Sequence, residues 1–240
     1  MPKPLHILAK PEDIAKRVIV AGDPARVEQL SKYLEGAKLV NKNRGYLTYT
    51  GTYEDVRVTV ATHGIGGPSA SIVFEELKML GAKLIVRLGT CGGMVKGQKV
   101  GDYVIPTGAA YLPGGTVGTY VPGACMPAVP SFDVLKALVE SVEQKGLKYY
   151  VGPVISADAF YIEDPDFVKK WVSRGIIAVE MECATLFTLG LLRGFKTGAL
   201  LIVSDVVLDK VEEMATAEEL KEQVEKAAYA VLDAIIKVEV

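Results

Sequence analysis

Short apolar segments alternate with amphipathic segments along most of this 240-residue chain. We expect strands at residues 17–22, 56–63, 82–90, 148–156, 175–181 and 196–205. We expect helices at residues 24–34, 68–80, 132–146, 164–174 and 182–194, and a last long helix from about residue 212. This order predicts an α/β fold with three αβα layers, in which helices cover both faces of a central mixed, largely parallel sheet.

Composition limits the class of protein. With 50% hydrophobic residues the chain can bury a full core, and no Pro/Ser-rich linker interrupts it, so we predict one domain over residues 1–240. A net charge of −2 and a pI near 5.8 provide no basic stripe for nucleic acid. No run approaches the roughly 18 apolar residues of a membrane span, and charges and prolines interrupt the first residues. We therefore expect a cytoplasmic protein that binds neither nucleic acid nor membrane.

The cysteines and histidines do not form a metal-binding or disulfide pattern. The three cysteines (Cys91, Cys125, Cys183) are far apart in sequence, no C-x-x-C occurs, and there are two histidines, His6 and His63. We expect no metal site and no disulfide framework. Scarce Asn and Gln beside plentiful Lys, Glu and Val are typical of a heat-adapted source.

Four of the expected strands end in polar residues. The segments are "VAGDPAR", "RLGTCGG", "VEME" and "VSD", each directly after a buried run. In α/β folds such strand ends assemble the ligand site. The Gly- and Pro-rich stretch 101–130 is a long connection that we expect to carry function or subunit contacts.

Two glycine- and serine-based chemistries are not supported. "THGIGGPSA" has Ser69 where the dinucleotide fingerprint needs its third glycine, so it does not predict a nicotinamide site. The chain has no G-x-S-x-G elbow of a serine hydrolase.

Basic residues at two strand ends predict an anion site. Arg26 lies near the start of the helix after Gly22, where free backbone N–H groups favour an anion. Arg87 lies inside an apolar run, where its charge needs a partner, and Thr90 adds a hydroxyl at the same strand end. The alternative for Arg87 is an ion pair with a structural glutamate.

Acidic residues follow two other strands. Glu180 and Glu182 point to the same side of an extended segment, where a hydroxyl-rich ligand would satisfy them. Glu182 could equally open the next helix. Asp205 ends an apolar strand and is a candidate proton donor, with a turn or N-cap role as the alternative.

In this order, "AGDPARV", "RLGTCGG", "SADAFY", "VEMECATLF" and "VSD" resemble the motifs of the nucleoside phosphorylase family. That family includes hexameric purine nucleoside phosphorylases, uridine phosphorylases, and methylthioadenosine and adenosylhomocysteine nucleosidases. The resemblance covers nearly the whole chain. It implies reversible phosphorolysis of purine (deoxy)ribonucleosides, with 5′-methylthioadenosine among the candidates, to give free base and (deoxy)ribose 1-phosphate. Phosphate is then a substrate, and no cofactor is implied.

The resemblance also implies residue roles. It assigns phosphate binding to Gly22, Arg26, Arg87 and Thr90, and to Arg44 lent by a neighbouring subunit. It assigns ribose binding to Glu180, Met181 and Glu182. His6 matches a residue that reaches the 5′ end of the nucleoside across a dimer interface. It assigns base binding to Cys91, Gly92, Phe160, Ser204 and Asp205, with Asp205 as general acid at N7. Because two site residues come from a partner, it implies a homo-oligomer, a hexamer built as a trimer of dimers.

Alternatives remain within the family and outside it. "AFYIEDPDF" lacks the glutamine and arginine with which the uridine phosphorylases recognise uracil, which favours a purine. A nucleosidase uses water, so three arginines would have no anion to bind. After Asp205 the chain has Lys210 and no arginine, unlike bacterial purine phosphorylases, which leaves the 5′ preference open. A non-catalytic nucleoside-binding protein is a further alternative, although every reacting position is filled.

Overall fold

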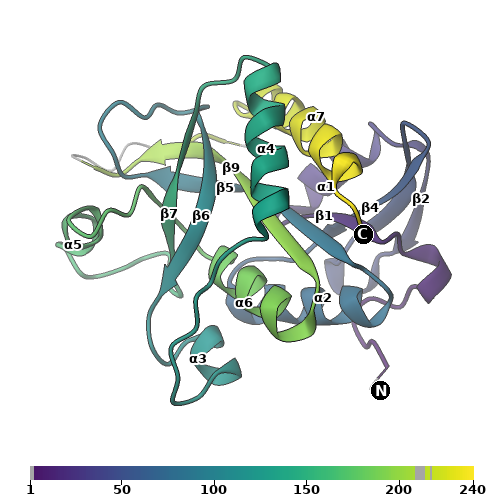
Figure 1. Ribbon diagram of the computed structural model, residues 1–240, viewed down its shortest axis with the longest axis horizontal. Helices are drawn as coiled ribbons and strands as arrows, with labels where there is room; N and C mark the ends of the chain where they lie inside the picture. Colours follow the sequence, from purple (N-terminus) through teal and green to yellow (C-terminus); the bar gives the residue numbers. More distant parts are fainter. Residues whose placement is uncertain (1–2, 209–213, 217) are drawn as a thin grey trace.

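The computed structural model describes residues 3–208, 214–216 and 218–240, and their strands form one mixed sheet (Figure 1). The order of the nine strands is β2-β3-β4-β1-β5-β8-β7-β6-β9. Their bounds are β1 Arg17–Ala21, β2 Glu35–Asn41, β3 Thr48–Tyr53, β4 Val56–Thr62, β5 Leu84–Gly93, β6 Tyr103–Tyr111, β7 Tyr149–Ser156, β8 Ala178–Glu180 and β9 Lys196–Val206.

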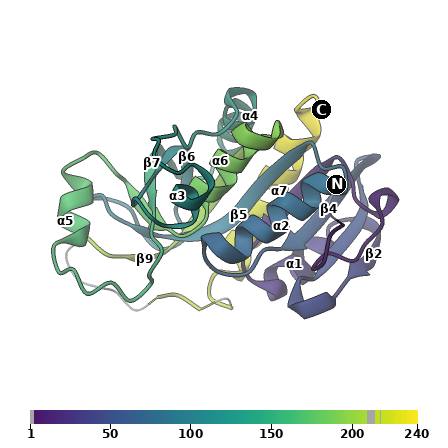
Figure 2. The same cartoon turned by 90° about the horizontal axis from the view of Figure 1, so that it is seen from below.

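The helices lie on both faces of this sheet (Figure 1). They are α1 Pro24–Ser31, α2 Gly67–Met79, α3 Thr116–Tyr120, α4 Phe132–Gln144, α5 Phe167–Val172, α6 Cys183–Arg193 and α7 Lys221–Lys237, with 3-10 turns η1 Pro11–Asp13 and η2 Asn43–Gly45. One core contains Phe74 of α2 and Phe187 of α6, and a second contains residues of α1, α4 and α7. The predicted α/β fold, with a central sheet between helical layers, is confirmed. Figures 1 and 2 show α5 at one end of the molecule, apart from the other helices.

Part of the sheet closes on itself. β5 pairs with β8 and β9, and β8, β7, β6 and β9 then follow one another back to β5. The parallel pairings are β1–β4, β1–β5, β5–β9, β6–β7 and β7–β8, while β2–β3, β3–β4, β5–β8 and β6–β9 are antiparallel. The strands β4, β1, β5 and β9 are therefore all parallel, and their carboxyl ends meet at one edge.

The structure corrects three expectations. The stretch 101–130 is not only a connection, because β6 lies within it and pairs with β7 and β9. Pro106 argued against a strand in this stretch, because proline cannot donate to a β-ladder. The pairing with β7 shifts register between Pro106 and Ala109. The strands β2 and β3 were also missed; β2 is largely exposed and lacks an apolar run. The last helix begins at Lys221, and residue 212 lies outside the described residues. No helix in the described ranges is long and apolar enough to cross a membrane.

Leu138 tests the packing of α4 against the sheet. It is 0% exposed and belongs to the core formed with α7. We expect Leu138→Ala to lower the free energy of unfolding by about 2–5 kcal/mol, because it removes buried apolar surface and leaves a cavity. Urea denaturation measures the change. The same substitution at Leu191, which is 50% exposed on α6, is the control and should cost far less. Equal losses would contradict this packing.

Candidate active site

The polar residues at the carboxyl ends of β4, β1, β5 and β9 lie at the same edge of the sheet. Gly22 follows β1, while Arg87 and Thr90 lie in β5. Asp205 of β9 pairs in register with Gly92 of β5, next to a register shift at Cys91. A Cβ built on Gly92 would lie 3.4 Å from Asp205 Oδ2. The fold therefore brings the predicted phosphate and base residues of three strands to one place.

Arg87 is buried and paired with two carboxylates. Its Nη2 bonds Glu182 Oε2 and lies 3.6 Å from Glu180 Oε2. Burial alone would lower the pKa of the Arg87 guanidinium, but Glu182 and Glu180 outweigh that effect and raise it. The ion pair proposed as the alternative for Arg87 is thus present. It does not use the whole guanidinium, since Nε has no hydrogen-bond partner among the described residues.

Gly89 makes room for this guanidinium. Residues 87 and 89 lie on the same side of β5, and the Arg87 guanidinium extends along the strand to lie over Gly89. A Cβ built on Gly89 would collide directly with Arg87 Nη1. The glycine of "RLGT" is therefore needed for the position of Arg87.

Glu180 organises the turn from β8 into α6. Its Oε2 accepts the backbone N–H groups of Glu182 (2.7 Å) and Cys183 (2.8 Å), and the Ser156 hydroxyl donates to Oε1. Burial raises the pKa of Glu180, and Arg87 opposes that rise. Its side chain is 0% exposed and both of its oxygens are engaged by the protein, and its predicted place beside the ribose stays a prediction.

Glu182 joins the ion pair to the start of α2. Its Oε1 accepts the Gly66 N–H at 2.6 Å, and Oε2 bonds Arg87. Burial works against ionisation of Glu182, but Arg87 and the Gly66 N–H hold its pKa below the usual value. Glu182 does precede α6, as the alternative held, yet its side chain makes no capping bond there. Its carboxylate is directed to the strand-end site.

Arg26 lies close to Arg87. It belongs to the first turn of α1, where Asp23 accepts the N–H of Ala25 at 2.9 Å. Nη1 of Arg26 is 3.5 Å from the Leu88 carbonyl oxygen. Burial, and then the nearby charge of Arg87, lower the pKa of Arg26 to about 10. A half-buried and a buried cation this close form a site that an anion would stabilise.

Ser204 and Asp205 lie together at the end of β9. The Ser204 hydroxyl donates to Asp205 Oδ1 at 2.7 Å, and its oxygen is 3.3 Å from the Cys91 carbonyl. Burial raises the pKa of the Cys91 thiol, so Cys91 is a neutral, space-filling neighbour. Asp205 is half-buried, which places a carboxylate at the boundary between core and solvent.

Two of the remaining predicted residues, Phe160 and Met181, follow β7 and β8 respectively. Phe160 is 62% exposed and packs edge-on against Tyr161 in the segment after β7. Met181 is half-buried and borders a small cavity with Ser156 and Thr185. Their roles beside a nucleoside stay predictions. Lys210 lies outside the described residues.

His6 and Arg44 are neighbours on one surface of the chain. Asn43 Nδ2 donates to the carbonyl oxygens of Leu5 (3.3 Å) and His6 (3.1 Å), which ties the N-terminal segment to η2. Arg44 is exposed and has a φ of 53°, in the left-handed region that a non-glycine residue seldom adopts. Whether the two residues enter a partner's site stays a prediction.

The sequence pattern did not single out Glu76, which positions His6. Glu76 is buried in α2 and accepts the N–H groups of Leu5 (2.9 Å), His6 (2.9 Å) and Ile7 (2.7 Å). It also bonds His6 Nδ1 at 2.8 Å. Burial opposes its charge, but these donors lower its pKa. An acid on the apolar face of a predicted helix was the available signal.

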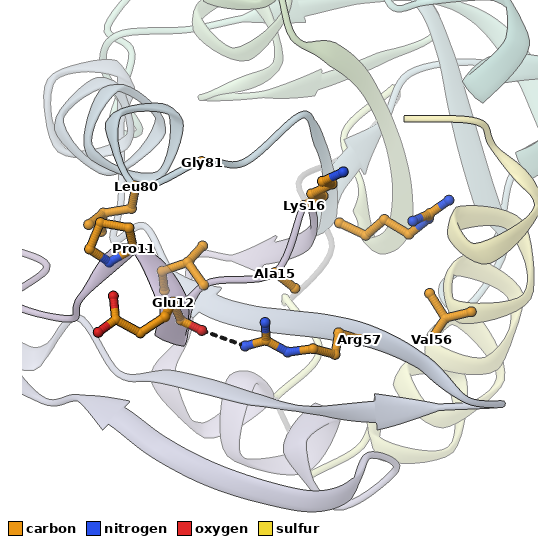
Figure 3. A pocket seen from close by; sticks show the side chains of 10 residues that line it. Pro11, Glu12, Ala15, Lys16, Val56, Arg57, Leu80 and Gly81 are labelled. Atoms are coloured by element: carbon orange, nitrogen blue, oxygen red, sulfur yellow. Dashed lines mark hydrogen bonds between the residues drawn. The ribbon is translucent and has the colours of Figure 1, made fainter.

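A separate cavity of about 690 Å³ lies at the opposite end of the same strands (Figure 3). Lys16 directly precedes β1 and Arg57 is the second residue of β4, so the cavity borders the amino ends of these strands. Arg57 donates to the Glu12 carbonyl at 2.8 Å. This cavity shares no lining residue with the strand-end cluster and is not part of the candidate site.

The fold and the site define an α/β protein with an anion site and buried carboxylates at the carboxyl ends of parallel strands. The chain belongs to the phosphorylase superfamily, whose family model matches residues 16–237. It is 35% identical over 240 residues to a guanosine phosphorylase of Halorubrum lacusprofundi, covering 98% of this chain and 99% of the relative. It is 39% identical over 216 residues to a DeoD-type purine nucleoside phosphorylase of Clostridium novyi, covering 89% and 92%.

Two solved structures share the fold. Purine nucleoside phosphorylase from Toxoplasma gondii, in complex with immucillin-H, has a TM-score of 0.89 and 30% identity, covering 98% of this chain and 96% of that one. Uridine phosphorylase from Vibrio fischeri has a TM-score of 0.85 and 30% identity, covering 99% of each chain. The resemblance inferred from the motifs is thus confirmed at the level of the family.

Gly89→Ala tests the dependence of Arg87 on its neighbour. The added methyl group displaces the guanidinium and breaks its bond to Glu182, so we expect a lower melting temperature. Gly118→Ala is the control, because the nearest atom to its new Cβ is 3.8 Å away. Calorimetry of both variants measures the difference. Similar melting temperatures for the two would contradict this account.

Glu76 provides a pH-dependent test. A lowered pKa in the folded state means that Glu76 stabilises N-terminal docking above its usual value of 4.5 and loses this effect as pH falls below it. We expect hydrogen-exchange protection of Leu5, His6 and Ile7 to fall in that window. Glu76→Gln should show weak protection at every pH. Glu75→Gln is the control, since Glu75 pairs with Arg193 instead at 2.8 Å, and a matching loss there would refute this role.

Proposed function

We propose that this protein is a purine nucleoside phosphorylase, a pentosyltransferase that uses phosphate to cleave the N-glycosidic bond of purine (deoxy)ribonucleosides. The products are free base and (deoxy)ribose 1-phosphate. The observation that carries the proposal is the placement of Arg26 of α1 close to Arg87 of β5, which pairs with Val20 near the end of β1 and bonds Glu182. Relatives named guanosine phosphorylase and purine nucleoside phosphorylase support it.

The arginines supply the anion subsite. Burial, and then repulsion by Arg87, lower the pKa of Arg26, and a phosphate between the two arginines would offset both effects. The Gly22 backbone and Thr90 lie close to the same site. A held phosphate presents an oxygen to the anomeric carbon and its negative charge stabilises an oxocarbenium-like sugar. A water-using nucleosidase would have no such need for a half-buried and a buried cation side by side.

Glu182 and Asp205 act on the nucleoside. Glu182 carboxylate oxygens accept hydrogen bonds from the ribose 2′- and 3′-hydroxyls, in addition to the bonds that fix them. Asp205 protonates N7, so the purine leaves as a neutral species. Ser204, which donates to Asp205 at 2.7 Å, orients that carboxyl group. The reaction needs no metal or organic cofactor.

The proposal extends to the assembly and the setting of the enzyme. His6 and Arg44 lie on one surface together, which suits their joint contribution to a partner's site. We propose a homohexamer, built as a trimer of dimers, in which each pair of subunits exchanges these two residues. We also propose a cytoplasmic location, where nucleosides and inorganic phosphate are both available.

The direct test is release of free base by the purified protein, with and without phosphate, from inosine, guanosine, adenosine, 5′-methylthioadenosine and uridine. Phosphate-dependent release of purines, with ribose 1-phosphate or its methylthio analogue as co-product, is the expected result, and relative rates define the 5′ preference. Base release without phosphate would instead identify a nucleosidase. Release of uracil in preference to purines would identify a uridine phosphorylase. The absence of any base release would favour a non-catalytic binding protein.

Asp205→Asn tests the general acid. We expect it to lower kcat for purine nucleosides by about 10²- to 10⁴-fold, because the amide cannot protonate N7. Asp133→Asn is the matched control, since Asp133 lies in the first turn of α4 and pairs with Lys196. Steady-state kinetics of both variants decide the point. An Asp205→Asn enzyme with wild-type kcat would remove Asp205 from the mechanism.

A further inference from the structure

His63 is a buried histidine to which the mechanism above gives no role. It follows β4 directly, and its backbone N–H donates to the Ala21 carbonyl at 2.8 Å, which fixes it beside the end of β1. The Ser69 hydroxyl donates to the His63 carbonyl at 2.7 Å. Its side chain is 0% exposed, so these contacts hold the imidazole inside the strand-end site.

The imidazole has two polar atoms without partners. Neither Nδ1 nor Nε2 of His63 has a partner at full hydrogen-bond geometry within the described part of the chain, although the adjacent Gly64 backbone acts on the ring and opposes the fall of its pKa. One side of the ring meets Phe74 edge-on, with ring centroids 5.6 Å apart. Buried polar groups in native proteins are almost always satisfied, so two unsatisfied nitrogens in a ligand site indicate a missing ligand group.

The surroundings of His63 identify the chemistry of that group. Its Cε1 is 3.5 Å from the point where a Cβ on Gly22 would lie, at the start of the anion subsite. The charges of Arg87, Glu182 and Arg26 all reach the ring. Burial, and then Arg87, lower the pKa of His63 to about 3, so the ring is neutral and carries one N–H donor. The nearby cations favour an anion as the acceptor of that N–H.

We propose that His63 is a further phosphate-binding residue, whose imidazole N–H donates to an oxygen of the phosphate held between Arg26 and Arg87. This inference rests on the proposed function. A third cation here would add to the repulsion between the two arginines. A neutral imidazole supplies a directional hydrogen bond without that repulsion, and a third fixed donor restricts the rotation of a tetrahedral nucleophile.

Imidazole ¹⁵N NMR tests the contact in the intact protein. The chain has two histidines, so His6→Gln leaves the His63 signals alone in the spectrum. We expect titration with inorganic phosphate, without nucleoside, to shift the protonated ring nitrogen of His63. Unchanged His63 signals at phosphate concentrations that raise the melting temperature of the protein would overturn the inference, as would a wild type that binds no phosphate.

Kinetics test the consequence. We expect His63→Phe to raise the KM for phosphate by about 10- to 100-fold and to leave the KM for nucleoside nearly unchanged. Its melting temperature without phosphate should not fall, because an apolar ring replaces unsatisfied polar atoms, whereas a merely structural role would lower it. His63→Gln keeps an N–H donor and should recover part of the phosphate affinity. An unchanged KM for phosphate in His63→Phe would refute the proposal.

The two proposals fail separately. If phosphate shifts His63 in the wild type and no nucleoside is cleaved, the enzymatic function is wrong and the His63 contact stands. If nucleosides are cleaved with phosphate while the KM for phosphate is unchanged in His63→Phe, the function stands and the contact is wrong.

Discussion

The burial of the Arg87 guanidinium between Glu182 and Glu180 is the interaction on which the site depends. β5 carries Arg87 and pairs with β1, β8 and β9, so the charge lies at the centre of the sheet. A charge buried at this depth is tolerated only when it is paired, and removing one partner of such a pair typically costs about 3–5 kcal/mol. The acids that contact the cation therefore stabilise the fold itself.

This requirement links segments that are far apart in sequence. Glu182 connects Arg87 to the Gly66 N–H before α2, and Glu180 connects the same cation to Ser156 at the end of β7. The two carboxylates are about equally buried and differ in their protein partners. Glu180 spends its acceptors on the turn into α6, while Glu182 retains acceptor capacity at the strand ends. One ion-paired cluster thus connects β5, the end of β7, the turn into α6 and the start of α2.

Much of this could be predicted, because the relevant signals are local. A polar residue directly after an apolar run marks a strand end, and parallel strands bring such ends together, so the grouping of Arg26, Arg87 and Asp205 followed from the sequence. The two interpretations of Arg87 were not exclusive, since one guanidinium has donors for both a carboxylate and an anion. β6 was missed because Pro106 breaks the strand pattern, although pairing with β7 and β9 stabilises it.

The residues that sequence could not place depend on distant partners. Glu76 binds the backbone of a segment about 70 residues earlier. His63 lies beside Gly22, which follows β1, and within reach of the charge of Arg87 in β5. The three-residue strand β8 makes the same point. A strand was predicted at 175–181, but the sequence did not indicate its partners: Val179 lies opposite Gly92 and Glu180 opposite Ser156, so β8 closes the ring from β5 to β9. That closure fixes Glu180 and the following Glu182 against Arg87, which explains why the acids of this chain lie in its core.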